Sequence, residues 1–323
     1  MTLKHAKHEK YERLIAYCAD LPDESCAVVH PCDAPSLTGA VRAGEAGLIR
    51  PILVGPKARI ERIAREEGLD IGSLEIIDTA HSHASAQQGA ELVKEGRARM
   101  LMKGSLHTHE LLAAVVSRDA GLRTERRISH CFVMDVPVLD RVVIISDAAV
   151  NIFPTLAEKA DIVQNAIELA HALGNPRPLV AILSATESVN PKIQSTLDAA
   201  ALCKMADRGQ ITGGLLDGPL ALDNAVDLDA ARIKKIDSPV AGRADILIAP
   251  DLEAGNMLAK SLSFMADADA AGIVVGARVP IVLTSRADSL QTRLASVAIA
   301  VLVACHHDRA ALAKIAIKNS GEG

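Results

Sequence analysis

The chain of 323 residues contains no tryptophan, and aromatic residues make up only 2% of it. It therefore lacks the aromatic platforms on which single-stranded nucleic acids stack their bases. Its formal net charge is -5 at pH 7, so it also lacks the excess of cations that binding to a phosphate backbone needs. We expect no nucleic-acid partner.

Long apolar runs and paired cysteines are absent as well. No window approaches the roughly 18 consecutive apolar residues of a membrane span, and residues 1–10 are polar and basic rather than a secretory segment. Six cysteines are scattered along the chain without a Cys-x-x-Cys pair. This usage is typical of reduced thiols, and we expect a cytoplasmic protein with no membrane partner.

Common nucleotide-binding and nucleophile signatures are missing. The chain has no G-x-x-x-x-G-K-[ST] loop and no G-x-S-x-G elbow, and its glycines do not form G-x-G-x-x-G. The pair His81 and His83 has neither the helical spacing nor the further ligands of a zinc site. Surface or loop histidines are the favoured interpretation.

One metal hypothesis stays open on the residues. Asp223 and Asp227 have i, i+4 spacing and Asp229 is close, so they could hold a divalent cation for a decarboxylating dehydrogenase. The alternative, which we favour, is a capped and solvated start of a helix, where aspartate is common.

Strand and helix patterns alternate almost throughout the sequence, in which 49% of the residues are hydrophobic. Strands are predicted at 26–30, 51–55, 74–77, 100–102, 130–134, 142–145, 179–183, 215–218, 246–249, 272–275 and 281–283. Helices are predicted at 11–19, 36–46, 57–67, 84–95, 108–118, 156–173, 195–206 and 254–265, with two more from residue 290 onward. This order predicts a largely parallel α/β sheet, and so many strands favour two domains with a boundary near Ser146.

The stretch from Pro280 to Ser289 carries the strongest local signal. A short apolar strand ends in a polar loop that contains Ser285 and Arg286, and a helical pattern follows from Leu290 with Asp288 at the expected N-cap. An open α/β sheet binds anions at such a place, where an arginine can hold a phosphate by two hydrogen bonds. A solvated turn with a surface arginine is the alternative.

Other polar residues follow predicted strands in the same way, and they are candidates for substrate binding. They are Lys103, Asp147, Asn151, Asp217, Glu253 and Asn256. His130 joins this set if the ligand reaches it. Otherwise it is a core histidine, which is the role that we prefer.

Several longer motifs carry a family resemblance. The runs Ser238–Asn256 and Leu283–Ser289 resemble the phosphate acetyl/butyryltransferase family. Further stretches are similar to its butyryltransferase branch: 101–104 with His107-Thr108, 121–124, 128–130, 147–151, 189–192 and 218–224. The likeness spans about residues 10 to 305.

The resemblance implies a reversible transfer of a short acyl group, in which acyl-CoA and phosphate give acyl phosphate and CoA. It implies two three-layer α/β/α domains of the isocitrate/isopropylmalate dehydrogenase-like fold, with the active site in the cleft between them. The expected domains are residues 1–145 with 278–323, and residues 146–277, which would carry the contact of a homodimer. The family needs no metal and no nicotinamide cofactor.

Carried over onto this chain, the resemblance makes Ser285 and Arg286 the catalytic serine–arginine pair. Acetyl-specific members have an aspartate seven residues after that serine, where this chain has Thr292, so Asp288 is the nearest carboxylate for a catalytic role. They also have an arginine in the helix after the His-Thr pair, where residues 111–116 are apolar here. Both departures favour butyryl, with acetyl as the close competitor.

Two other classes of function stay open. One is a metal-dependent hydroxy-acid dehydrogenase on the same fold, which would need a nucleotide signature that is missing here. The other is a CoA-binding module without activity, against which the intact Ser285-Arg286 pair argues.

Overall fold

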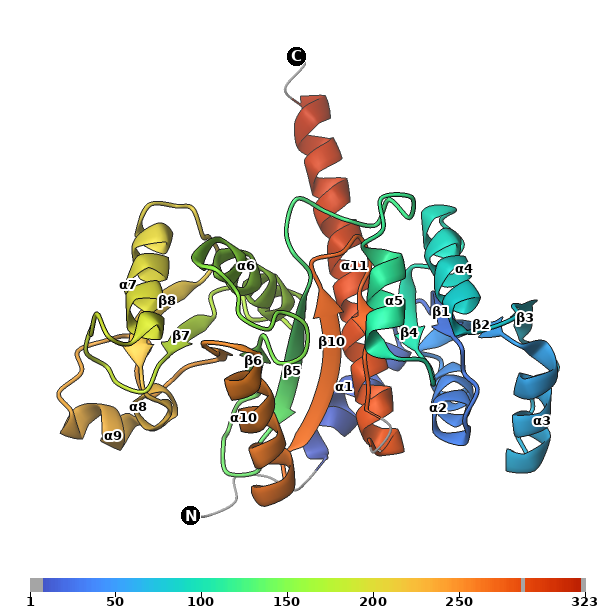
Figure 1. Cartoon of the computed structure of the whole chain (residues 1–323), viewed down its shortest axis with the longest axis horizontal. Coiled ribbons are helices and arrows are strands. Elements are labelled where there is room, and N and C mark those ends of the chain that lie inside the picture. The colour runs from blue at the N-terminus through green and yellow to red at the C-terminus, as the bar shows by residue number, and fades with distance from the viewer. Residues whose placement is uncertain (1–7, 286–287, 321–323) are drawn as a thin grey trace. The chain divides into compact units, whose positions relative to one another are not determined.

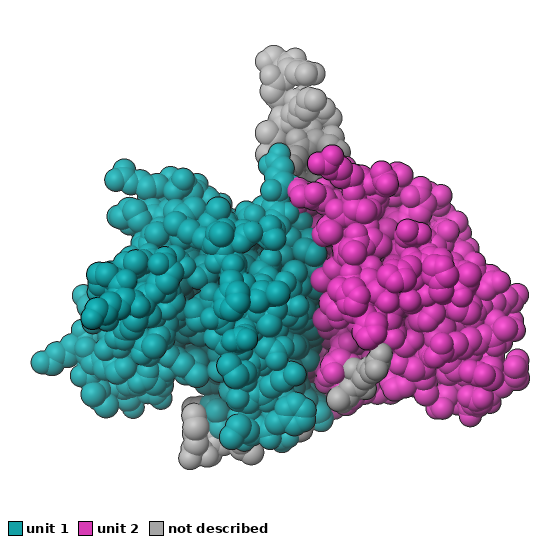
Figure 2. Space-filling view, viewed as in Figure 1, with its two compact units in different colours: residues 1–10, 125–276 teal, residues 11–124, 277–323 magenta. Residues whose placement is uncertain are grey.

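The structure is a computed structural model that describes residues 8–285 and 288–320 (Figure 1). The chain forms two compact units, which Figure 2 colours separately. Unit 1 comprises residues 1–10 and 125–276, and unit 2 comprises residues 11–124 and 277–323.

The observed units differ from the expected domains chiefly in residues 125–145, and also in residues 1–10, which belong to unit 1. The expected boundary placed residues 125–145 with the N-terminal part of the chain, whereas this segment lies in unit 1. The reason is strand pairing: β5 (Ser129–Asp135) pairs with β10 (Asp269–Val275), and β6 (Val143–Ser146) pairs with β9 (Ile246–Ile248). A domain boundary that separates β5 and β6 from β10 and β9 would divide these paired strands.

Unit 2 is built on parallel strands in the order β3-β2-β1-β4-β11. The strands are β1 (Glu24–Val29), β2 (Ile49–Gly55), β3 (Glu75–Asp78), β4 (Met100–Lys103) and β11 (Ile281–Val282). The helices are α1 (Glu9–Ala19), α2 (Ala34–Glu45), α3 (Lys57–Glu67), α4 (Ser82–Lys94), α5 (Thr108–Val115) and α11 (Leu290–Ser320). The predicted parallel strand–helix alternation is confirmed for this unit.

Two glycines show how helices cover both faces of this sheet. A Cβ on Gly89 of α4 would lie 2.7 Å from Val29 and 3.5 Å from Leu101, which share one face. A Cβ on Gly39 of α2 would lie 3.6 Å from Met102, which points to the other face. Unit 2 therefore has the predicted three layers, with α4 on one face and α2 on the other.

Helix ends in unit 2 follow local rules, with one correction. The predicted helix 57–67 matches α3, and Gly68 ends it with φ +64°, a backbone angle that glycine adopts without strain. The helix predicted at 36–46 begins at the polar residue Ser36, which would make Ser36 its cap. Asp33 caps it instead, because its Oδ1 accepts the N–H of Ser36 at 2.9 Å, which makes Ser36 an N3 residue.

The end of the chain forms one helix, α11, rather than the two that were expected. Its segment Leu290–Asp308 is long and apolar enough to cross a membrane, with a mean hydropathy of 1.2. However, 61% of the apolar window within that segment is buried, and α11 packs against α2, β4 and β11. It is thus placed as a core helix of unit 2.

Unit 1 has strands in the order β10-β5-β6-β9-β7-β8. Its remaining strands are β7 (Leu179–Leu183) and β8 (Leu215–Leu220), and its helices are α6 (Leu156–Ala172), α7 (Gln194–Asp207), α8 (Leu222–Val226), α9 (Leu228–Ile233) and α10 (Leu252–Met265). The strands from β6 to β8 are parallel, but β5 runs antiparallel to both β6 and β10. The short helices α8 and α9 were predicted only as a helix start at Asp223 and Asp227, without bounds.

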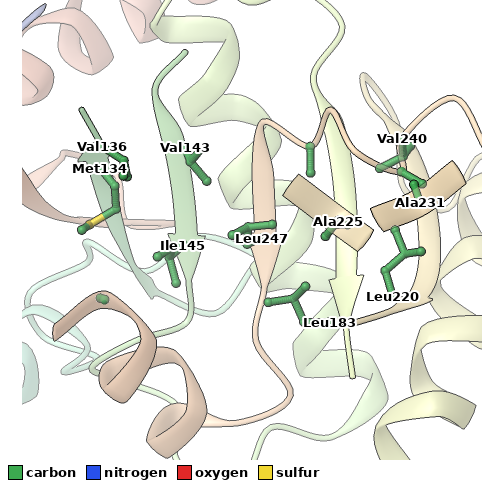
Figure 3. Close-up of a cluster of buried hydrophobic side chains, with 14 of the residues drawn as sticks. Met134, Val136, Val143, Ile145, Leu183, Leu220, Ala225, Ala231, Val240 and Leu247 are labelled. Carbon is green, nitrogen blue, oxygen red and sulfur yellow. The ribbon is translucent and has the colours of Figure 1, made fainter. Parts of the chain in front are cut away.

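The core of unit 1 consists of aliphatic side chains, as the lack of aromatics requires. Figure 3 shows Ile145, Leu247 and Leu220 from the sheet packed with Ala225 of α8 and Ala231 of α9. All five are at most 2% exposed. The short helices α8 and α9 therefore cover this face of the sheet with small residues. With 5 and 6 residues, each helix is too short to show an apolar period in the sequence.

Candidate active site

Two of the predicted site residues meet at one edge of unit 2. Strands β4 and β11 are parallel neighbours, with Val282 paired to Met102. Lys103 ends β4, and Ser285 follows β11 after two residues, so both lie at the carboxyl edge of the sheet. Ligands of open α/β sheets bind at such an edge.

Charged groups fix the backbone of Ser285 on both sides. The carboxylate Oδ2 of Asp288 accepts the N–H of Ser285 at 2.6 Å, and Nη2 of Arg293 donates to the Ser285 carbonyl at 2.7 Å. Nη1 of Arg293 donates to the hydroxyl of Thr284 at 2.9 Å. Arg286, the predicted phosphate clamp, lies outside the described residues.

The predicted helix cap at Asp288 is wrong. Helix α11 begins at Leu290, and the Oγ of Ser289 accepts the N–H of Thr292 at 3.1 Å. Ser289 is therefore the N-cap. Asp288 is left to hold the loop through Ser285 instead.

Asp288 lies in a mixed electrostatic environment. Burial raises the pKa of its carboxyl above the ordinary value, while the hydrogen bond from Ser285 and the positive charges of Arg293 and Lys103 oppose that rise. Lys103 is itself only 8% exposed, and its Nζ donates to the carbonyl of Gly104 at 3.1 Å. A carboxylate and two cations thus act on one loop.

The segments that follow β1 and β4 also approach each other closely. A Cβ on Gly104 would lie 2.4 Å from the carbonyl oxygen of His30, so only glycine fits there. His30 has φ +56°, an uncommon angle for a side-chain-bearing residue. Its Nδ1 is 3.0 Å from the hydroxyl of Ser85, and burial together with the charge of Arg59 lowers its pKa.

A cavity of about 500 Å³ opens in unit 2 beside these residues. Its lining includes His30, Arg59, His107, Asp33 and Glu110. The helices α2, α3, α4 and α5 begin close to these lining residues, so the partial positive charge of their N-termini adds to the charge of Arg59. Such a cavity suits an anionic ligand.

In unit 1, Asp147 and Asn151 organise their own loop. Oδ1 of Asp147, which is 3% exposed, accepts the N–H groups of Ala149 and Val150 at 2.9 and 3.0 Å. The amide nitrogen of Asn151 donates to the carbonyl of Ile128 at 3.0 Å. These contacts give both residues a part in shaping the loop, and their substrate contact stays a prediction.

The other candidates of unit 1 fall in different places. The side chain of Asn256 donates to the carbonyl of Ala148 at 3.0 Å, so the start of α10 meets the Asp147 loop, and Glu253 is exposed in the first turn of that helix. Asp217 lies inside β8, which β9 and β7 separate from β6. His130 is 0% exposed and stacks edge-to-face on Phe132, as a core histidine does.

Sequence reasoning missed Arg293 and Arg59. The signal for Arg293 was present: an arginine stands within the apolar helical spacing of Leu294, Val297 and Val301, which marks a buried charge. Arg59 carried no signal, because it stands among several charged residues of an ordinary surface helix. The expectation of a site in the cleft between the domains stays a prediction.

The proposed metal ligands have other partners. Asp227 caps α9 by accepting the N–H of Ala230 at 2.8 Å, and a carboxylate oxygen of Asp223 lies 3.3 Å from Nζ of Lys234. Within residues 8–285 and 288–308, no group of three or more metal-binding side chains is arranged to hold a metal ion. The capped helix start, our favoured interpretation of these aspartates, accounts for both side chains.

Comparisons with known proteins agree with one another. Residues 82–301 match the model of the family described as phosphate acetyl/butaryl transferase. The chain is 60% identical over 310 residues to a phosphate acetyltransferase of Rhizobium meliloti, covering 96% of this chain and 98% of the relative. It is 40% identical over 299 residues to a phosphate butyryltransferase of Clostridium beijerinckii, covering 93% and 99%.

A solved structure is similar as well. It is a branched-chain phosphotransacylase from Enterococcus faecalis V583, with a TM-score of 0.77 and 30% identity over 87% of this chain and 99% of that one. This likeness confirms the predicted α/β fold class.

Proposed function

The chain belongs to the phosphate acetyl/butyryl transferase family, and we propose that acetyl is the acyl group that it transfers fastest. Its reaction is the reversible conversion of acyl-CoA and phosphate into acyl phosphate and CoA. The observation that carries the choice of acetyl is the contrast in identity, 60% to a phosphate acetyltransferase against 40% to a phosphate butyryltransferase. This revises our expectation from the sequence, which favoured butyryl with acetyl as the close competitor.

The test is a comparison of kcat/KM for acetyl-, propionyl- and butyryl-CoA with phosphate, followed by release of the CoA thiol. Two extra methylenes in an apolar pocket would favour butyryl by about ten- to twenty-fold, so an acetyl preference requires a pocket that excludes the longer chain. We expect the highest kcat/KM with acetyl-CoA. A butyryl-CoA value equal to or above it would overturn the proposal.

The mechanism that we propose uses the loop around Ser285. In the direction of acyl-CoA formation, Asp288 accepts the proton of the CoA thiol and the thiolate sulfur attacks the acyl carbon. The tetrahedral intermediate then collapses, the carbon–oxygen bond to phosphate breaks and phosphate leaves. A free thiol has a pKa of about 8.5, so a carboxylate of raised pKa beside cations is a suitable partner for this step.

Lys103 and Arg286 would bind the phosphate and its developing charge in this proposal. The hydroxyl of Ser285 would donate to the oxyanion of the tetrahedral intermediate. Support comes from the edge of unit 2, where Lys103 and Ser285 lie together and the charge of Lys103 acts on Asp288. Holding both substrates in attack geometry would supply much of the rate enhancement.

The cavity lined by Arg59 would receive a phosphate group of CoA. Its volume of about 500 Å³, the charge of Arg59 and the nearby helix N-termini support this role. Asp33 and Glu110 in the same lining would repel a phosphate group. A phosphate bound there would therefore also contact the N-termini of nearby helices.

We further propose that catalysis needs no metal ion. The ligand set proposed from sequence is occupied, with Asp227 in a helix cap and Asp223 paired with Lys234. Exhaustive treatment with EDTA should therefore leave the rate of acyl transfer within about twofold of the untreated enzyme. Activity lost to EDTA and restored by Mg²⁺ or Mn²⁺ would contradict this proposal.

A homodimer in the cytoplasm is the expected form of the enzyme. Unit 1 exposes large apolar side chains near the start of α10, namely Ile152 at 61%, Phe153 at 74% and Met257 at 62%. Clustered exposed apolar groups mark interaction surfaces in soluble proteins. We propose that a second copy of the chain covers them.

A further inference from the structure

Arg293 is a buried cation on the face of α11 that packs into unit 2. It is 4% exposed, and its neighbours on the same face, Val297 and Ala300, are 0% exposed. Burial lowers the pKa of its guanidinium, while the negative charges of Asp288 and Asp33 raise it. A buried charge is costly unless it has partners, so its contacts require an explanation.

The contacts of Arg293 converge on the loop before the helix. Its Nη1 donates to the hydroxyl of Thr284 at 2.9 Å and its Nη2 donates to the carbonyl of Ser285 at 2.7 Å. The planar guanidinium therefore joins two consecutive residues by two hydrogen bonds of fixed direction. A lysine at this position could make only one of these bonds in the same geometry.

Helix α2 holds Arg293 from its other side. A Cβ on Gly39 would lie 3.1 Å from Cδ and 3.8 Å from Cβ of Arg293. This separation is tighter than ordinary van der Waals contact, so any side chain at residue 39 would push the arginine stem. The absence of a side chain at Gly39 thus leaves room for the one conformation that reaches the loop.

Asp288 completes the arrangement from the opposite side of Ser285. It accepts the N–H of Ser285 at 2.6 Å, while Arg293 donates to the carbonyl of the same residue. Both polar backbone atoms of Ser285 are thereby fixed, and its hydroxyl is limited to the staggered rotamers that start from this one backbone position. A shift of about 1 Å in such a group costs about 100-fold in rate.

We propose that Arg293 is a positioning residue for acyl transfer: it holds Thr284 and Ser285 in the geometry that the reaction needs and does not touch substrate. The inference rests on the proposed role of Ser285 as a donor in the active site. It assigns to a buried side chain a contribution to kcat that is separate from binding of CoA or phosphate.

The first test replaces the guanidinium without shortening the stem. Arg293→Met removes both hydrogen bonds and keeps the volume that faces Gly39, and Arg293→Lys keeps the charge and one donor. We expect kcat to fall about 30- to 100-fold in the methionine variant and less than about 10-fold in the lysine variant, with both KM values within about threefold of wild type. Thermal unfolding and circular dichroism measure the folded fraction.

The outcomes separate positioning from the alternatives. A well-folded Arg293→Met enzyme with near-normal kcat would overturn the proposal. So would a tenfold rise in KM at unchanged kcat, which would mean that Arg293 binds substrate. A loss of rate that only follows the loss of folded protein would assign Arg293 a structural role alone.

The second test displaces Arg293 without removing it. Gly39→Ala places a methyl group against the arginine stem but favours helix formation in α2, since alanine is the better helix former. We expect kcat to fall about 3- to 10-fold at unchanged thermal stability. In the Arg293→Ala background, where the stem is gone, the Gly39→Ala change should have no further effect on kcat. Equal losses in both backgrounds would contradict the proposal.

The same variants distinguish a failure of this inference from a failure of the proposed mechanism. Ser285→Ala removes the hydroxyl and leaves the backbone contacts in place. If Ser285→Ala has normal kcat while Arg293→Met is slow, the proposed donor role of Ser285 is wrong and Arg293 acts on another group of the loop. If Ser285→Ala is slow while Arg293→Met is normal, the positioning role alone is wrong.

Discussion

At the scale of single residues, two neighbouring arginines are assigned different tasks. Arg293 is buried and donates to the carbonyl of Ser285, whereas Arg286 has the proposed role of phosphate clamp. A side chain that clamps an anion can be removed without opening the core, but a buried one cannot. The two residues therefore predict different combinations of lost activity and lost stability.

For Arg286, we predict that Arg286→Ala removes most activity and leaves stability unchanged. Loss of a charged hydrogen bond to phosphate costs roughly 2–4 kcal/mol of transition-state stabilisation, so kcat/KM should fall about 30- to 1000-fold. The matched control is Arg62→Ala on α3, where an exposed arginine lies 3.7 Å from Glu66 and should change neither quantity. Near-normal kcat/KM in a well-folded Arg286→Ala enzyme would refute the clamp.

Asp288 predicts a pH dependence. Burial, opposed by Ser285, Arg293 and Lys103, raises its pKa above the ordinary 3.8, so the base form is lost at a higher pH than in an ordinary aspartate. The rate with CoA as substrate should therefore fall as the pH drops through this raised pKa. Asp288→Asn keeps an oxygen for the Ser285 N–H, and it should be slow and lack this acid limb.

The same shift has a consequence for stability. Because the folded state binds this proton more tightly than the unfolded state, the contribution of Asp288 is most favourable below pH 3.8 and declines as the pH rises through the raised pKa. Asp288→Asn should therefore flatten the dependence of the unfolding free energy on pH in that window. If the rate of Asp288→Asn still falls at low pH as the wild-type rate does, Asp288 is excluded as the base.

How far the site could be predicted also depends on the residue. Lys103 and Ser285 could be placed at one sheet edge from sequence, because each follows a strand of a parallel sheet. The bonds that tie Asn151 to Ile128 and Arg293 to Ser285 could not, because they join parts of the chain whose approach depends on tertiary packing. Spacing in sequence carries no information on which carbonyl oxygen a buried side chain meets.

At the scale of elements, the start of α11 shows where local rules become ambiguous. Asp288 and Ser289 are both good N-cap residues, and sequence alone does not choose between them. In the structure the hydroxyl of Ser289 accepts the N–H of Thr292, and Asp288 turns back to Ser285. The division of tasks between the two residues follows from the position of the loop at the end of β11.

This assignment of the cap predicts a stability effect for Ser289. Ser289→Ala removes the acceptor for the Thr292 N–H, and loss of an N-cap hydrogen bond lowers the free energy of unfolding by about 1 kcal/mol. Urea unfolding monitored by circular dichroism measures the change. Asp288→Asn is the comparison, since it should leave the cap intact. An unchanged midpoint for Ser289→Ala would mean that another group caps α11.

At the scale of the whole molecule, strand–helix alternation predicted the α/β class and most elements, because each strand is short, apolar and followed by an amphipathic helix. The antiparallel course of β5 was not predicted, since the sequence of a buried strand does not encode its direction. The expected domain boundary consequently separates the segment 125–145 from the unit in which it lies.

The last prediction concerns assembly. The exposed fractions of Phe153, 74%, and Met257, 62%, are high for large apolar side chains, and burial of such groups in an interface stabilises it by about 1.5–3 kcal/mol each. Light scattering should therefore give the mass of two 34.0 kDa chains, and Phe153→Asp or Met257→Asp should shift the protein toward the mass of one chain. Tyr17→Asp, at a 58% exposed aromatic residue of unit 2, is the matched control and should leave the dimer intact. A wild-type protein with the mass of one chain at micromolar concentration would contradict the dimer, and dissociation by Tyr17→Asp alone would place the contact on unit 2.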